Sequence, residues 1–168
     1  MDITTEVSML AAHMADPREG HLKAALQVFA YLKKKHNARL IYDLSYPKID
    51  LNEFKDGESW TSFYGDVQEA ISANAPTPRL RAVVLRLFVD ADHAGNMLTR
   101  RSRTGYVQMI NTAVVNWFSK KQGLIETLTF GSEFVALKTA MEANRGLRYK
   151  LRMMGVLFNG PTYVFCDN

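Results

Sequence analysis

A long helical pattern between strand-like segments constrains the fold of this chain more than any other feature. Residues 131–154 carry apolar side chains at helical spacing, and Gly155 is suited to end that helix. Strand-like runs lie before and after it, at 83–89, 105–110, 113–118 and 162–166. A helix between two strands of one sheet normally returns the chain to pair in parallel with an earlier strand. The order predicts an α/β fold with a mixed β-β-β-α-β sheet.

The continuous apolar run at 83–89 is the expected parallel partner of the last strand, because strands buried on both faces have this composition. Asn111 and Thr112 are suited to a hairpin turn between the second and third strands. In this arrangement the C-terminal ends of the first and last strands meet, which is where open α/β sheets tend to bind ligands.

The chain before residue 83 has a different pattern. Asp16 and Pro17 predict the start of an amphipathic helix that ends at the basic run 33–36, and a short strand is expected at 38–42. Proline and glycine interrupt the segment that follows, where Trp60, Phe63 and Tyr64 are expected to pack on a neighbouring surface. We therefore divide the chain into a mainly helical segment, a linker and a sheet domain, at 1–46, 47–82 and 83–168.

Composition excludes several classes of protein. A content of 47% hydrophobic and 23% charged residues is enough for a core and argues against disorder. No run approaches the roughly 20 apolar residues of a membrane-spanning helix, and the N-terminus has no signal-peptide pattern. The lone Cys166 cannot form an internal disulfide, so a reducing, intracellular location is expected.

Carboxylates are predicted to gather at one edge of the sheet. Asp90, or Asp92, follows the first strand, Asp167 follows the last, and Glu133 lies in the first turns of the long helix, on its inward stripe. Oxygen ligands of this kind suit Mg²⁺ or Mn²⁺, and a pair of such ions can promote attack on a phosphodiester. Each acid also has a purely structural interpretation, as a turn former or a helix-dipole partner.

Basic side chains cluster within a net charge of +4. The clusters that could contact phosphates are Arg100, Arg101, Arg103, Lys120 and Lys121. The alternative is a solvated hairpin edge, where lysine discourages strand pairing. Arg145, Arg148 and Arg152 are expected to be solvated on the outer face of the long helix.

Four motifs in the same order resemble the ribonuclease H domain of copia-type retrotransposon polyproteins. They are VDADHAG at 89–95 with TRRSRTGY at 99–106, WFSKKQ at 117–122, TFGSEFVAL at 129–137, and CDN at 166–168. Upstream, residues 6–10, 17–21 and 31–34 resemble the end of the reverse transcriptase region that precedes this domain.

The resemblance implies a ribonuclease H-like fold that hydrolyses the RNA strand of an RNA–DNA hybrid. Asp90, Glu133 and Asp167 would hold two Mg²⁺ or Mn²⁺ ions, with Asp90 preferred to Asp92 because it lies directly at the strand end. The five basic residues would contact the hybrid. The reverse transcriptase region of the same polyprotein is the expected partner, in cytoplasmic virus-like particles and also in the nucleus.

One departure from the family bears on activity. Ribonuclease H sites usually use a fourth acid after the third motif, whereas the sequence stops at Asn168, so a domain truncated after the third motif is expected. The alternative function is therefore a catalytically incomplete remnant that binds nucleic acid, or a structural module of a reverse transcriptase polyprotein.

Overall fold

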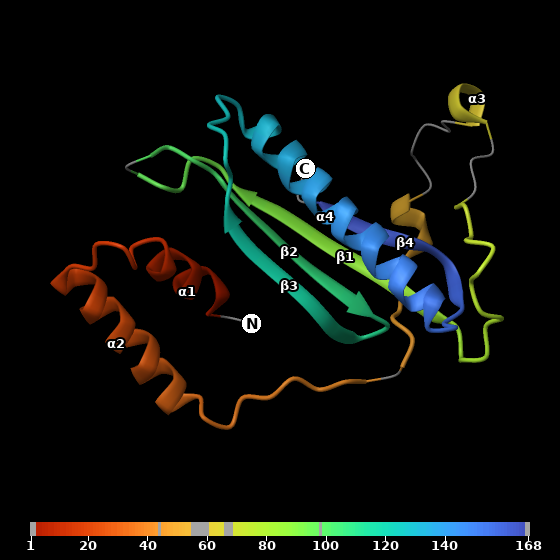
Figure 1. The fold of residues 1–168 in the computed structure, drawn as a ribbon, viewed down its shortest axis with the longest axis horizontal. Helices are drawn as coiled ribbons and strands as arrows, with labels where there is room; N and C mark the ends of the chain where they lie inside the picture. The colour runs from red at the N-terminus through yellow and green to blue at the C-terminus, as the bar shows by residue number, and fades with distance from the viewer. Residues whose placement is uncertain (1–2, 44, 55–60, 66–68, 98, 167–168) are drawn as a thin grey trace.

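A four-stranded mixed sheet forms the centre of the computed structural model, which describes residues 3–43, 45–54, 61–65, 69–97 and 99–166. Its strands are β1 (Val83–Asp92), β2 (Arg103–Ile110), β3 (Ala113–Lys121) and β4 (Phe158–Cys166), in the spatial order β3-β2-β1-β4 (Figure 1). β1 pairs in parallel with β4 and antiparallel with β2, which pairs antiparallel with β3. The predicted α/β class, mixed sheet and strand order are confirmed.

Helix α4 (Thr129–Met153) crosses from β3 to β4 and covers one face of the sheet (Figure 1). The core between them contains Leu87, Val89 and Ala91 of β1, packed with Ala136 and Ala140 of the helix. The buried positions of α4 follow a four-residue spacing, at Ser132, Ala136, Ala140 and Asn144. Of the apolar stripe expected at 137, 140, 147, 151 and 154, only Ala140 is fully buried, and Met154 is exposed. Small side chains line the contact, which allows the helix backbone to approach the strands closely.

The predicted turn at Asn111 and Thr112 joins β2 to β3. Asn111 has a φ of 53°, in the left-handed region that asparagine tolerates better than most residues. Its backbone N–H donates to the Val84 carbonyl at 2.8 Å, and its side-chain Oδ1 accepts from the Val84 N–H at 2.9 Å. The turn is thereby tied to the first residues of β1.

The N-terminal segment contains α1 (Thr4–Ala11) and α2 (Glu19–Lys34). α2 starts two residues later than predicted, because the Arg18 N–H donates to His21 Nδ1 at 3.0 Å and no side-chain cap from Asp16 forms. The strand expected at 38–42 is also absent, since this segment has no regular structure. α1 lies against β3 (Figure 1), where the Thr5 and Ser119 hydroxyls are 3.4 Å apart.

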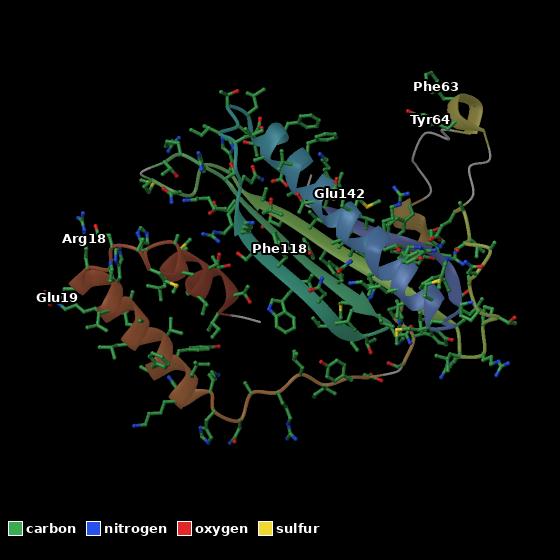
Figure 2. The ribbon with its side chains drawn as sticks, in the orientation of Figure 1. Arg18, Glu19, Phe63, Tyr64, Phe118 and Glu142 are labelled. Carbon is green, nitrogen blue, oxygen red and sulfur yellow. The ribbon has the colours of Figure 1, made fainter. Side chains whose placement is uncertain are left out.

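The described part of the linker contains two single-turn elements, η1 (Leu51–Phe54) and α3 (Thr61–Tyr64). Phe63 and Tyr64 are 79% and 64% exposed and their rings contact each other, so the expectation that they hold the linker to a surface is wrong (Figure 2). Trp60 lies outside the described residues. Phe54 makes this contact instead, with its ring edge-on to Tyr163 and Phe165 of β4. No described helix is long and apolar enough to cross a membrane.

Candidate active site

The first predicted acid, Asp90, lies two residues before the end of β1, so the prediction that it stands directly at the strand end is wrong; Asp92 is the last residue of the strand. Val89, the residue before Asp90, is the register partner of Cys166 at the end of β4, so the two strand ends lie side by side. The Asp90 side chain is exposed, and it points to the sheet face away from α4 because its neighbours Val89 and Ala91 are buried under that helix. It lines a hollow of about 510 Å³ together with Phe88 and Phe165, whose rings stack at 4.7 Å.

The second predicted acid, Glu133, lies in the first turns of α4 and is half-buried. Partial burial, and to a smaller degree the nearby charge of Glu133, raise the pKa of the Cys166 thiol at the end of β4. Glu133 thus lies near the end of β4. The last residue of that strand, Cys166, pairs with Val89, the residue before Asp90. The third predicted acid, Asp167, lies outside the described residues.

The donor set at this edge suits a hard cation only in part. Carboxylate oxygens are the ligands that Mg²⁺ and Mn²⁺ prefer, and Asp90 and Glu133 both supply them. Within the described ranges, however, no group of three or more His, Cys, Asp or Glu side chains could hold a metal ion. A complete metal site at this edge requires the carboxylate of Asp167.

Asp92, the alternative first acid, is engaged in the turn after β1. A methyl group placed on Gly95 would overlap the Asp92 carboxylate, so this glycine allows the acid to pack against the turn backbone. Asp92 is also the register partner of Arg103 on β2. These contacts give Asp92 a local structural role that Asp90 does not share.

A buried polar network fixes the start of α4. The hydroxyl of Ser132, which is fully buried, donates to the Thr129 carbonyl at 2.7 Å, so it accepts from His93 Nδ1 at 3.2 Å. Gln122 Nε2 donates to the Ser132 carbonyl at 2.9 Å and to Thr104 Oγ1 at 3.1 Å. This network connects the turn after β1 and the end of β3 to the helix turn that carries Glu133.

Sequence reasoning did not single out Gln122 or Ser132, although both lie inside the quoted motifs. A second serine, Ser102, belongs to the same set, since its buried hydroxyl accepts from the Ala94 N–H at 3.0 Å and its carbonyl accepts from the Gln122 N–H at 2.8 Å. The only sign of the role of Ser102, Ser132 and Gln122 is that these polar side chains are buried. We assign them as positioning residues for Glu133 and for the turn after β1.

The basic residues predicted to contact nucleic acid fall into two groups. Arg101, Arg103 and Lys121 line a hollow of about 260 Å³ that also includes Asp92. Arg103 and Lys121 are register partners on the open face of the sheet, and Arg103 donates to Ser8 Oγ of α1 at 2.7 Å. Arg100 and Lys120 are exposed and do not line this hollow. Lys120 pairs with buried Thr104, so its position faces the α4 side of the sheet.

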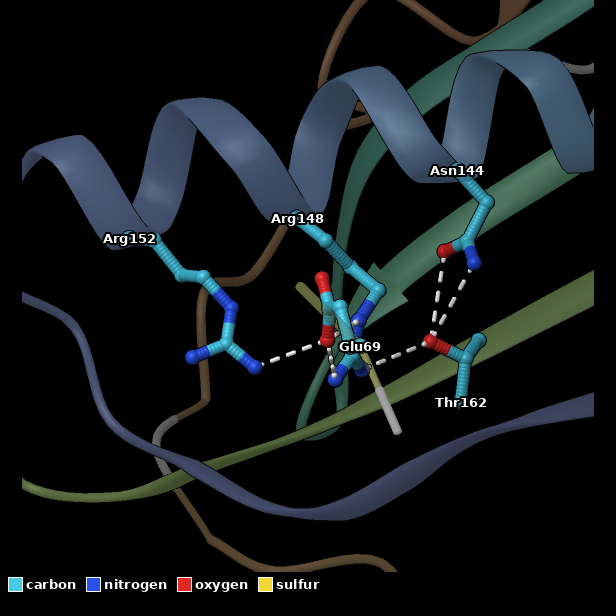
Figure 3. A network of polar contacts seen from close by, with 5 residues as sticks. All are labelled: Glu69, Asn144, Arg148, Arg152 and Thr162. Carbon is cyan, nitrogen blue, oxygen red and sulfur yellow. Dashed lines mark hydrogen bonds and ion pairs between the residues drawn. The ribbon is translucent and has the colours of Figure 1, made fainter. Parts of the chain in front are cut away.

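Two arginines expected to be solvated are instead engaged in a polar network. The side chains of Arg148 and Arg152 are 14% and 23% exposed, and both form ion pairs with Glu69 at 2.7 Å (Figure 3). The expectation was wrong for these two residues, whereas Arg145 is exposed as predicted. Arg148 and Arg152 continue the four-residue spacing of the buried positions of α4 and contact β4, and the linker returns at Glu69 to pair with both.

Comparison with known proteins adds a partial and distant likeness. Over 85 residues, 51% of this chain, the sequence is 29% identical to the retrovirus-related Pol polyprotein from transposon TNT 1-94 of Nicotiana tabacum. This match supports an origin in a retrotransposon polyprotein. The chain is also 38% identical over 55 residues, 33% of its length, to secreted RxLR effector protein 161 of Plasmopara viticola.

The matched segments cover 6% of the transposon polyprotein and 39% of the effector. No protein-family model matches the chain, and no solved structure matches it.

Proposed function

We propose that this chain is the ribonuclease H module of a retrotransposon polyprotein and that it hydrolyses the RNA strand of an RNA–DNA hybrid. The observation that best supports the proposal is the parallel pairing of β1 with β4, which sets Asp90 of β1 beside the last residues of β4. The likeness to a transposon Pol polyprotein supports the biological setting.

In this proposal Asp90, Glu133 and Asp167 hold two Mg²⁺ or Mn²⁺ ions, which when bound activate water and stabilise the leaving oxygen. The other residues of the chain position these ligands and the substrate. The hydrogen bonds of Ser132 and Gln122 orient the helix turn that carries Glu133. Arg101, Arg103 and Lys121 offer three positive charges beside this edge, which suit contacts to the hybrid backbone.

The test is cleavage of a labelled RNA–DNA hybrid in Mg²⁺ or Mn²⁺. We expect Asp90→Asn and Glu133→Gln each to reduce cleavage at least about 100-fold, since each removes a charged ligand. Glu142→Gln is the matched control, because it removes the same charge from a 71% exposed position on the same helix and should preserve the rate. Cleavage that both ligand variants retain would contradict the site, and no cleavage by the unmodified chain would contradict the activity.

A second candidate function is binding of the hybrid without hydrolysis, as an incomplete remnant or a structural module beside the reverse transcriptase region. It is favoured by the cluster of Arg101, Arg103 and Lys121, which needs no metal to attract a polyanion. Hybrid binding that weakens as salt rises, with no cleavage in either metal, would select this function. Under either function we place the module inside the cell, in virus-like particles of the cytoplasm and in the nucleus.

A further inference from the structure

We propose that Arg148 and Arg152 form a phosphate-binding site that the Glu69 carboxylate occupies in this structure. A single oxygen, Glu69 Oε2, accepts hydrogen bonds from Arg148 Nε at 3.0 Å, from Arg148 Nη2 at 2.7 Å and from Arg152 Nη2 at 2.7 Å (Figure 3). The two guanidinium groups of α4 thus converge on one point from neighbouring helical turns. Glu69 reaches that point from the linker, 79 residues earlier in the chain than Arg148.

The two arginines are held in place by contacts that do not involve Glu69. Arg148 Nη1 donates to Thr162 Oγ1 of β4 at 3.2 Å, and the same hydroxyl lies 3.3 Å from Asn144 Nδ2 (Figure 3). Both guanidinium groups also lie over the Phe158 ring, at 4.3 and 5.1 Å from its centre. Because the site is preorganised by β4 and α4, it keeps its shape when the carboxylate leaves.

The site has more hydrogen-bonding capacity and charge than one carboxylate uses. Two positive charges face one negative charge, and the Nε of Arg152 is buried without a hydrogen-bond partner among the described residues. Inorganic phosphate carries more negative charge than a carboxylate and has more oxygens to share between two guanidinium forks, whereas a backbone phosphodiester carries one charge, as the carboxylate does. The surrounding hollow has a volume of about 800 Å³, and its wall also carries Arg145 and the ion pair of Lys138 with Glu142.

This site is separate from the proposed active site and does not depend on it. Arg148 lies 15 residues after Glu133 on α4, which places the two about 22 Å apart along the helix axis. Because the competing carboxylate belongs to the linker, a phosphate that displaces it would also release the linker from α4 and β4. The inferred ligand is a phosphate group, whether free or part of a nucleic acid backbone.

The test follows the Arg148 and Arg152 Nε–H resonances by NMR as inorganic phosphate, or separately a single-stranded DNA oligonucleotide, is added to the full chain. Glu69→Gln removes the competing charge with little change in shape, so we expect it to bind phosphate about tenfold more tightly than the unmodified chain. Glu19→Gln is the matched control, since Glu19 pairs with Lys23 on α2, is exposed and does not line this hollow, and it should change the affinity less than twofold.

Each outcome bears on the proposal. Tighter phosphate binding in Glu69→Gln, lost again when Arg152→Gln is added, supports the site. If the oligonucleotide also shifts the Nε–H resonances, the ligand includes nucleic acid backbones. If only inorganic phosphate shifts them, the ligand is free phosphate. No gain in Glu69→Gln, or an equal gain in Glu19→Gln, overturns the proposal. If Glu69→Gln is less stable than the unmodified chain, thermal unfolding with and without phosphate tests the site. Phosphate should then raise the melting temperature of Glu69→Gln more than that of the unmodified chain.

Discussion

Val89 of β1 lies directly opposite Cys166 of β4 in a parallel register. A shift of one residue in either strand would turn every side chain to the other face of the sheet, so the buried Val89 and the core around it fix this register. The position of Asp90 relative to the end of β4 is therefore set by strand pairing and core packing. The rigid placement of one acid on a central strand is the feature that a metal-binding edge requires.

The Asp92–Gly95 contact gives a first prediction. Gly95→Ala would insert a methyl group into the space of the Asp92 carboxylate, which is exposed and can turn aside, so we expect a loss of no more than about 1 kcal/mol in the free energy of unfolding. Urea unfolding measures this loss. Gly123→Ala is the control, because a methyl group there meets nothing within 4 Å, and it should change stability by less than about 0.5 kcal/mol.

The same contact predicts that the two positions are coupled. In an Asp92→Ala background the carboxylate is gone, so the added Gly95→Ala change should cost much less than it does in the unmodified chain. Equal costs in the two backgrounds would show that the strain at Gly95 does not come from Asp92.

A second prediction concerns Gln122, whose amide nitrogen connects Ser132 and Thr104. Gln122→Ala removes both hydrogen bonds and leaves the buried Ser132 carbonyl without this donor, so we expect a loss of about 2–3 kcal/mol on urea unfolding. Thr104→Val removes one of the two bonds and should cost less. The exposed neighbour Lys120→Ala should change stability by less than about 0.5 kcal/mol, and a similar loss in all three variants would contradict a specific role for the network.

The sheet could be predicted from the sequence because short segments of the chain specify its strands and its hairpin turn. The apolar run at 83–89 and the turn residues Asn111 and Thr112 specify strands and a hairpin by composition alone, and the helix of α4 then dictates a parallel return. The helix start at Asp16 and Pro17 was predicted by the same kind of rule and was wrong. There the His21 ring, three residues after Arg18, satisfies the backbone instead.

The rest could not be predicted because it depends on contacts between distant parts of the chain. The segment 38–42 has strand-like composition but pairs with no neighbour, so it stays irregular. Arg148 and Arg152 continue the four-residue spacing of the buried positions of α4, and Phe158 of β4 and Glu69 of the linker cover them. At the candidate site the position of Asp90 beside the end of β4 followed from the order of elements, whereas the Ser132–Gln122 network required the folded structure.

A third prediction uses the alternation of side chains along β3. Lys121 lies on the open face beside Arg103, and Lys120 occupies the opposite face. If the open face contacts a hybrid, Lys121→Gln should weaken binding and lower the salt dependence, as the slope of log K against log salt, by about 1. Lys120→Gln removes the same charge and should leave both quantities nearly unchanged. Equal effects of the two variants in a fluorescence anisotropy titration would place the hybrid elsewhere.

The Glu69 ion pairs give a fourth prediction, on the pH dependence of stability. Hydrogen bonds from Arg152 and then Arg148 lower the pKa of Glu69 from 4.5 to about 2. A carboxyl group with a depressed folded-state pKa stabilises the fold above its unfolded pKa, so this contribution should be complete above about pH 5 and fall as the pH drops towards 2. We expect a loss of about 1 kcal/mol, because the side chain is 37% exposed and solvent screens the pair. Urea unfolding between about pH 6 and pH 3 measures it. The loss should be smaller in Glu69→Gln and in Arg152→Gln, since neither variant keeps the full pair, and an unchanged loss in both would assign the acid sensitivity to other carboxylates.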